Sequence, residues 1–209
     1  NNIIFYSSAA VYGNSFTDSN EEIDNLNPEN HYGKSKVLAE SELNKWLSFD
    51  ENRKLIVIRP SVVYGKGSNS NMNRMIDYIA KGKFVMVGKG DNFKTICYVE
   101  NLVDFTVYIQ NSISKSYEVY NYADFPHYNI REITNKISSL LKKKVIKIPY
   151  FIAYGVGLIF DFISLITQRK NNMSSNRVRK FCSNTSLSTK KIENLGYNPK
   201  YSLVESINK

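Results

Sequence analysis

Tyr32 and Lys36 are the residues whose types and spacing point most directly to chemistry. They stand four positions apart, so on a helix both side chains lie on one face, about one turn from each other. An ammonium group beside a phenol stabilises the phenolate, the form that removes a proton from a sugar or alcohol hydroxyl. The pair therefore predicts acid–base catalysis, and Ser8 is expected to hydrogen-bond the same substrate oxygen.

The elements that must position these residues alternate between strands and helices. The apolar run 3–6 leads directly into Ser7 and Ser8, which predicts a strand buried on both faces of a parallel sheet. Ligands bind at strand ends in such sheets. After a polar loop over 13–27, the patterns predict helices over 28–47, 72–80, 101–111 and 130–141, and strands over 55–58, 95–99 and 117–121. This alternation predicts an α/β fold with parallel strands.

Composition narrows the class of protein. The chain has 209 residues, of which 42% are hydrophobic and 13% aromatic, so it is globular rather than disordered. Its net charge of +9 suits nucleic acid, phosphorylated metabolites or an acidic membrane surface. The lysines are scattered and no nucleic-acid-binding signature occurs, so nucleic acid is not expected as a partner. Cys97 and Cys182 lack a CxxC motif or histidine cluster, so neither a metal site nor a disulfide framework is predicted, and a cytoplasmic location fits.

Several motifs around these residues occur in a fixed order. They are SSAAVYG over 7–13, YGKSK over 32–36, RPSVVYG over 59–65, YVENL over 98–102 and LGYNP over 195–199. Together they resemble the extended short-chain dehydrogenase/reductase family of NAD-dependent nucleotide-sugar epimerases and dehydratases. The resemblance covers almost the whole chain.

The resemblance implies a partial Rossmann-like parallel sheet followed by a smaller C-terminal α/β substrate-binding region. Residues 1–65 then form the C-terminal part of the NAD(P)-binding domain, and 66–209 form mainly the substrate-binding region with some returning Rossmann elements. The family's glycine-rich loop and acidic ribose-binding residue do not occur in this sequence. We therefore expect a C-terminal fragment that by itself is inactive and does not bind NAD or NADP tightly.

The same resemblance assigns roles to individual residues. It gives catalysis to Ser8, Tyr32 and Lys36, and cofactor contacts to Ser7, Tyr32, Lys36, Pro60, Ser61 and Val62. The nucleotide-diphosphate sugar is assigned to Ser8, Asn71 and Lys94. Lys94 occupies the position where many members of the family have an arginine that contacts the diphosphate of the sugar nucleotide. Val62 occupies a position where many members have an asparagine. Asn71 is equally well interpreted as a surface turn residue.

Two alanines narrow the reaction. The family's 4,6-dehydratases carry an Asp-Glu pair directly after the residue that matches Ser8, whereas this chain has Ala9 and Ala10. The resemblance thus disfavours dehydration and leaves two alternatives open, C4 epimerisation and 4-keto reduction, in the synthesis of cell-surface polysaccharide precursors. An alternative of another class is a non-catalytic scaffold or binding protein that retains the fold.

Residues 148–166 form a long, mostly apolar segment with Lys142, Lys143, Lys144 and Lys147 before it and Arg169 and Lys170 after it. Its length would allow a membrane span, but Asp161 would be costly at that depth, so an amphipathic helix is expected. The favoured destination of its apolar face is the core or a contact between two copies in a homodimer. The second is peripheral contact with the cytoplasmic face of the inner membrane.

Overall fold

The computed structural model describes residues 2–14, 16–21, 24–112, 115–168 and 174–209. Their contacts define two compact units. Unit 1 comprises Asn1–Asn73, Thr95–His127 and Thr185–Lys209, and unit 2 comprises Arg74–Lys94 and Tyr128–Asn184. The chain therefore leaves unit 1 and returns to it twice. The functions that the sequence assigned to residues 1–65 and 66–209 stay predictions.

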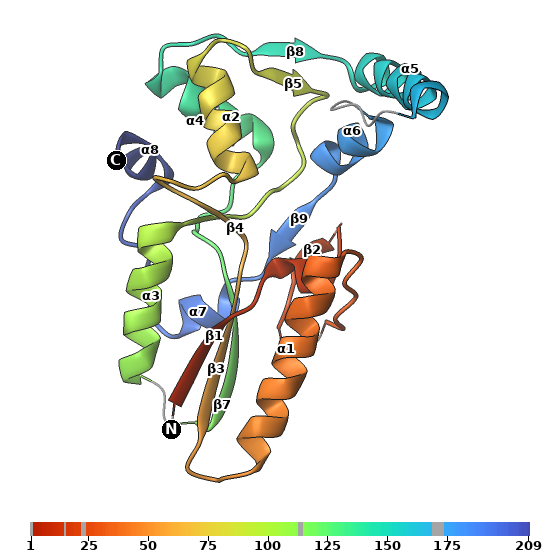
Figure 1. The fold of residues 1–209 in the computed structure, drawn as a ribbon. Coiled ribbons are helices and arrows are strands. Elements are labelled where there is room, and N and C mark those ends of the chain that lie inside the picture. Colours follow the sequence, from red (N-terminus) through yellow and green to blue (C-terminus); the bar gives the residue numbers. More distant parts are fainter. Residues whose placement is uncertain (1, 15, 22–23, 113–114, 169–173) are drawn as a thin grey trace. The chain divides into compact units, whose positions relative to one another are not determined.

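Unit 1 is built on a parallel sheet of three strands, β1 (Asn2–Tyr6), β3 (Lys54–Pro60) and β7 (Tyr117–Tyr122). The strand order is β1-β3-β7, and Figure 1 shows the three strands side by side. In the register, Phe5 of β1 pairs with Val57 of β3, and Val57 pairs with Val119 of β7. The predicted α/β fold with parallel strands is confirmed.

A helix covers each face of this sheet. Side chains alternate between the two faces of a strand, so the apolar run of β3 supplies both cores. On one face, Leu55 and Val57 pack with Leu43 and Leu47 of α1 (His31–Ser48). On the other face, α3 (Val99–Ser112) contributes to a second core, which contains Ile56, Ile58, Leu102, Phe105, Ile109, Tyr120 and Tyr122. The sheet is thus the middle of three layers (Figure 1).

Short elements complete unit 1. The 3-10 helix η1 (Ala9–Tyr12) follows β1, and helices α7 (Lys190–Asn194) and α8 (Leu203–Asn208) lie near the end of the chain. Two parallel pairs of short strands join distant segments. They are β2 (Phe16–Ser19) with β9 (Thr185–Leu187), and β4 (Val62–Tyr64) with β6 (Ile96–Tyr98).

Unit 2 contains one parallel strand pair and several helices. The strands are β5 (Val85–Val87) and β8 (Ile146–Ile148), and the helices are α4 (Ile130–Leu140), α5 (Tyr150–Thr167), α6 (Ser175–Cys182) and most of α2 (Asn71–Ala80). Asn129 and Glu132 form a capping box that begins α4, and Ile133 and Ile137 of α4 are buried.

Four predictions about elements were wrong. The stretch 13–27 is not all loop, because it contains β2, which pairs with β9. Strand β1 is only half-buried, because among the described strands it pairs with β3 alone. Helix α1 begins at His31 rather than at residue 28, because the Asn30 side chain accepts a hydrogen bond from Gly33 N and caps the helix there. The apolar face of α5 is not in the core, since Ala153 and Gly157 are the only buried residues of this helix, while the contact between two copies stays a prediction.

Candidate active site

Tyr32 and Lys36 lie in the first two turns of α1. The Lys36 Nζ donates a hydrogen bond of 2.8 Å to the carbonyl oxygen of Tyr6, the last residue of β1. It also lies 5.8 Å from the centre of the Tyr32 ring and 4.9 Å from that of Phe5. The Tyr32 side chain is 56% exposed. The structure therefore brings the predicted pair together at the carboxyl end of β1, with the phenol open to solvent.

Gly33 allows α1 to approach the end of β1 this closely. Gly33 is buried, and a Cβ atom added to it would stand 2.4 Å from the Ala10 carbonyl oxygen. On the other side of this contact, the Ser8 Oγ accepts a hydrogen bond of 3.2 Å from Ala10 N and caps η1. Ser8 thus lies in the short segment that packs against the helix carrying Tyr32, as the sequence predicted.

Two buried hydroxyl groups mark the ends of β1 and β3. The Oγ atoms of Ser7 and Ser61 are buried and have no hydrogen-bond partner among the described residues. Their backbones are fixed: Ser7 N donates to Ile58 O at 2.7 Å, and Ser61 N donates to Tyr122 O at 2.8 Å. A buried hydroxyl without a partner is unfavourable. Both groups are therefore suited to a polar ligand that supplies the missing hydrogen bonds.

A buried ion pair connects α1 to the sheet. Arg59 of β3 donates to both carboxylate oxygens of Glu40 in α1, at 3.1 Å and 2.7 Å. Arg59 also donates to the Tyr12 hydroxyl at 2.8 Å, and Tyr12 donates to Asn121 at 2.9 Å. Burial acts to lower the pKa of Arg59, but its bonds to Glu40 and Tyr12 raise it overall, so it stays protonated. Arg59 begins the motif RPSVVYG, and Glu40 follows the motif YGKSK by four residues, yet no role for either was predicted.

The remaining predicted residues are more scattered. Pro60 ends β3 and is buried, while Val62 begins β4 and is exposed. Asn71 is exposed at the first position of α2. Asn73, rather than Asn71, is bonded to the preceding loop, because its Nδ2 donates a hydrogen bond of 2.7 Å to Gly65 O. These positions belong to unit 1, together with Ser8, Tyr32 and Lys36.

Lys94 belongs to unit 2 and is not part of this group. Its Nζ donates a hydrogen bond of 3.0 Å to the carbonyl oxygen of Lys180 in α6. Burial lowers the pKa of Lys94 to about 8. The predicted contact of Lys94 with the diphosphate stays a prediction.

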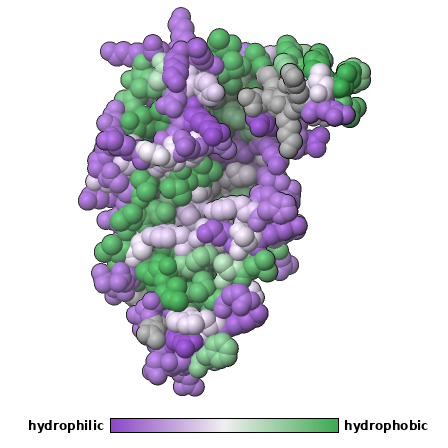
Figure 2. Space-filling view, in the orientation of Figure 1, coloured by the Kyte–Doolittle hydropathy of each residue, from purple (hydrophilic) through white to green (hydrophobic). Residues whose placement is uncertain are grey.

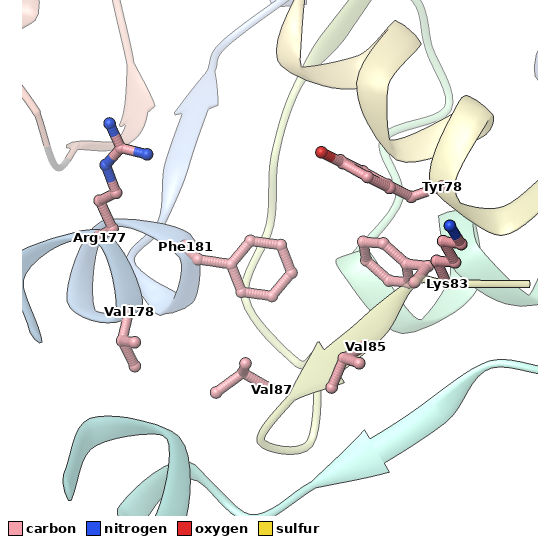
Figure 3. A pocket seen from close by; sticks show the side chains of 8 residues that line it. Tyr78, Lys83, Val85, Val87, Arg177, Val178 and Phe181 are labelled. Carbon is pink, nitrogen blue, oxygen red and sulfur yellow. The ribbon is translucent and has the colours of Figure 1, made fainter. Parts of the chain in front are cut away.

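Unit 2 also has a pocket that was not predicted (Figure 3). Its volume is about 300 Å³, and its walls are mostly apolar and aromatic, formed by Tyr78, Lys83, Phe84, Val85, Val87, Arg177, Val178 and Phe181. The Phe84 and Phe181 rings are tilted by 56° to each other, with 6.4 Å between their centres. None of the predicted site residues lines it. The only signal in the sequence was the short apolar run 84–87, which received no assignment.

With this geometry in place, comparison with known proteins is decisive about the family. The sequence model of the NAD dependent epimerase/dehydratase family matches residues 1–123. This chain belongs to that family. The matched part contains the motifs around Ser8, Tyr32, Lys36 and Arg59, so the resemblance stated from the sequence is confirmed.

Individual relatives of the family agree over longer stretches. The N-acetyl-alpha-D-glucosaminyl-diphospho-ditrans,octacis-undecaprenol 4-epimerase of Escherichia coli O157:H7 is 38% identical over 211 residues, which cover 100% of this chain and 63% of the relative. The UDP-glucose 4-epimerase of Vibrio cholerae is 28% identical over 127 residues, or 60% of this chain and 38% of the relative. The chain spans less than two thirds of either relative.

Solved structures of the family show the same fold. The UDP-glucuronic acid 4-epimerase of Bacillus cereus, in complex with UDP-glucuronic acid and NAD, superposes with a TM-score of 0.68. The superposition covers 99% of this chain and 59% of the other, at 17% identity. The α/β arrangement of this chain is therefore that of the epimerase/dehydratase family.

The residues present fit part of an NAD site. The family's cofactor is a dinucleotide rich in hydroxyl and phosphate oxygens, and the unpartnered hydroxyls of Ser7 and Ser61 offer it two hydrogen bonds at the ends of adjacent strands. Lys36 adds a cationic donor at the end of β1. The donor set is thus suited to the polar groups of NAD.

Proposed function

We propose that this chain carries the catalytic residues of an NAD-dependent 4-epimerase that acts on a sugar linked to a diphosphate. The observation that carries the proposal is the placement of Tyr32 and Lys36 against the end of β1, fixed by the Lys36–Tyr6 hydrogen bond and by the close approach of Gly33 to Ala10. A non-catalytic scaffold would not require this arrangement.

In the proposed reaction, Tyr32 moves a proton at the C4 hydroxyl of the sugar. Its phenolate removes the proton as the C4 carbinol is oxidised, and the phenol returns a proton to the same oxygen when the carbinol is restored with inverted configuration. The ammonium of Lys36 lies beside the Tyr32 ring, and the Ser8 hydroxyl hydrogen-bonds the C4 oxygen. Bound NAD would supply a reversible hydride acceptor for C4. Ser7, Ser61 and the backbone from Pro60 to Val62 would hold it.

Epimerisation is favoured over the other reactions of the family. The relatives from Escherichia coli and Vibrio cholerae are both 4-epimerases, and the first of them aligns with all of this chain. Ala9 and Ala10 supply no acid or base after Ser8, which argues against dehydration. The 4-keto reduction that the sequence left open is retained as the second candidate, because it needs the same Tyr32 and Lys36.

The proposal also specifies the group to which the sugar diphosphate is attached. The Escherichia coli relative is named for a substrate in which N-acetylglucosamine is linked through a diphosphate to undecaprenol, a long isoprenoid lipid, rather than to a nucleotide. The identity of 38% over all of this chain supports the lipid-linked sugar ahead of the nucleotide sugar that the sequence motifs suggested.

The test is the Tyr32→Phe variant of the full-length protein encoded by the gene. We expect kcat to fall by about 10² to 10⁴, because the proton-transfer route is lost while the ring is kept. Tyr117→Phe is the matched control, since Tyr117 lies at the opposite, amino end of β7 and should leave turnover unchanged. Each variant is assayed with undecaprenyl-diphospho-N-acetylglucosamine and with UDP-N-acetylglucosamine.

Near-normal turnover of Tyr32→Phe would overturn the assignment of the catalytic residue. An unaltered protein that inverts neither sugar would favour the scaffold. Inversion of the UDP-sugar alone would return the substrate to the nucleotide-sugar class.

A further inference from the structure

Helix α5 of unit 2 presents a long apolar face to solvent. Most of its apolar side chains are exposed, including Phe151 at 73% and Leu165 at 77%. At 3.6 residues per turn, the exposed positions fall on one side of the helix. They include Phe151, Ile152, Leu158, Ile159, Phe162, Leu165 and Ile166. Figure 2 shows hydrophobic colouring over this helix. An apolar surface of this extent marks an interaction site.

The opposite side of α5 is occupied by α6. Gly157 permits the contact, since a Cβ atom added to it would stand 2.7 Å from Ser175 N. Asp161, the only charged residue of α5, accepts a hydrogen bond of 3.0 Å from the same nitrogen atom. The buried residues Ala153 and Gly157 face this side. The exposed apolar face is therefore a single surface that the described part of unit 2 leaves uncovered.

The contact with α6 argues against a membrane-spanning helix. By length and composition α5 could cross a bilayer, and it is the one described helix of which this is true. However, α6 carries Arg177, Arg179 and Lys180, which would enter the hydrocarbon together with α5. A helix that lies along the membrane surface keeps α6 on its aqueous side and buries only the apolar face.

Exposed lysines precede α5 in the chain, on both sides of Ile146. Lys142, Lys143, Lys144 and Lys147 precede this helix and are all exposed, as is the apolar side chain of Ile146 between them. Arg169 and Lys170, which the sequence also placed beside this segment, lie outside the described residues. Basic side chains next to an interfacial apolar face favour anionic lipid headgroups.

We propose that α5 and the lysines before it form a docking surface for an anionic membrane, with the apolar face of α5 inserted at the level of the headgroups. The surface is defined within unit 2 alone, and a lipid-linked sugar substrate would give a separate reason for a membrane location. The other occupant that fits an uncovered apolar face is a second copy of this chain.

The experiment is flotation of the full-length protein with phosphatidylcholine vesicles, with and without phosphatidylglycerol. We expect binding at low salt to the anionic vesicles, and loss of most of that binding near 1 M salt, where the Debye length is about 3 Å. Phe151→Ser combined with Phe162→Ser should weaken binding by about tenfold or more. Leu38→Ser combined with Phe49→Ser is the control, because these exposed apolar residues of unit 1 lie outside the surface.

A second variant tests the charges without touching the apolar face. Lys143→Gln, Lys144→Gln and Lys147→Gln together should weaken low-salt binding by about fivefold per lysine and leave the high-salt remainder unchanged. Circular dichroism verifies that each variant folds. If the phenylalanine variant does not fold, the lysine variant still tests the proposal.

Four results would overturn the docking surface. The first is the absence of vesicle binding at low salt, and the second is equal binding by the phenylalanine variant and its control. The third is a dimer, detected by light scattering, that the phenylalanine variant dissociates while vesicles stay unbound. The fourth is resistance to extraction by alkaline carbonate, which would show a span. Vesicle binding is measured without turnover, so its failure leaves the proposed epimerase reaction standing.

Discussion

The ion pair between Glu40 and Arg59 gives the sharpest prediction about stability. Both side chains are almost fully buried, with Glu40 at 3% and Arg59 at 5% exposure, and Arg59 donates to both carboxylate oxygens. Glu40→Gln keeps the shape of the side chain and one oxygen acceptor but leaves the Arg59 cation buried without a counter-charge. Breaking a buried pair in this way costs about 3–5 kcal/mol. Because one hydrogen bond is kept, we expect about 3 kcal/mol.

Glu42 in the same helix is a matched control. It pairs with Lys45 at 2.8 Å, close to the shortest distance of the Glu40 pair, but the side chains of Glu42 and Lys45 are both largely exposed. Solvent screens such a pair, so Glu42→Gln should cost less than about 1 kcal/mol. Both variants replace a paired glutamate of α1 with glutamine, so the difference between their costs measures the effect of burial on the ion pair.

The free energy of unfolding is measured by urea denaturation followed by circular dichroism, with the slope of the transition checked for constancy. The double variant Glu40→Met/Arg59→Met should lose much less than the sum of the single variants, because no charge is left unpaired. A loss below about 1 kcal/mol for Glu40→Gln, or additive losses in the double variant, would refute the claim that burial gives this pair its importance.

Two further predictions concern unit 1. Gly33→Ala places a Cβ atom 2.4 Å from the Ala10 carbonyl, so α1 must shift and kcat should fall by about 10²-fold. Gly155→Ala is its control, because nothing lies within 4 Å of the added atom, and unaltered kcat in Gly33→Ala would contradict the positioning role. Burial raises the pKa of Asp124 to about 7, against the hydrogen bonds from Tyr98 N, Asn101 and Tyr122. The folded state then binds the proton more tightly than the unfolded state does, so the free energy of unfolding should fall as pH rises from about 4 to 7. Asp124→Asn should flatten this pH dependence, measured by urea denaturation at several pH values. An unchanged pH dependence would refute the assignment of the raised pKa to Asp124.

The sheet and the helices that cover it could be predicted because they follow local patterns. Strand β3 contains the uninterrupted apolar run 55–58, and α3 repeats its apolar residues at helical spacing, so both are recognisable without knowledge of the fold. The pairing of β2 with β9 could not be predicted in this way. It joins three- and four-residue strands that are more than 160 positions apart, and such short segments carry no periodicity.

The site was predictable only in part, for a different reason. Tyr32 and Lys36 were recognised because four-residue spacing places them on one helix face and because several family motifs surround them in order. Glu40 continues the same spacing, but a sequence does not distinguish a buried carboxylate from a solvated one on a helix rich in lysine. Helix α5 shows the same limit for apolar residues, since its pattern fits a core as well as an uncovered surface.

The restraints on α1 act at three successive levels along the helix. The Asn30 cap and the Gly33–Ala10 contact fix its first turn, the Lys36–Tyr6 hydrogen bond fixes the second, and the Glu40–Arg59 pair fixes the third. Most of these contacts are made to backbone atoms, which cannot change rotamer. The orientation of Tyr32 is therefore determined by the packing of a whole helix face. A proton-transfer group needs this rigidity, because its hydroxyl must return to one position in both halves of an inversion at C4.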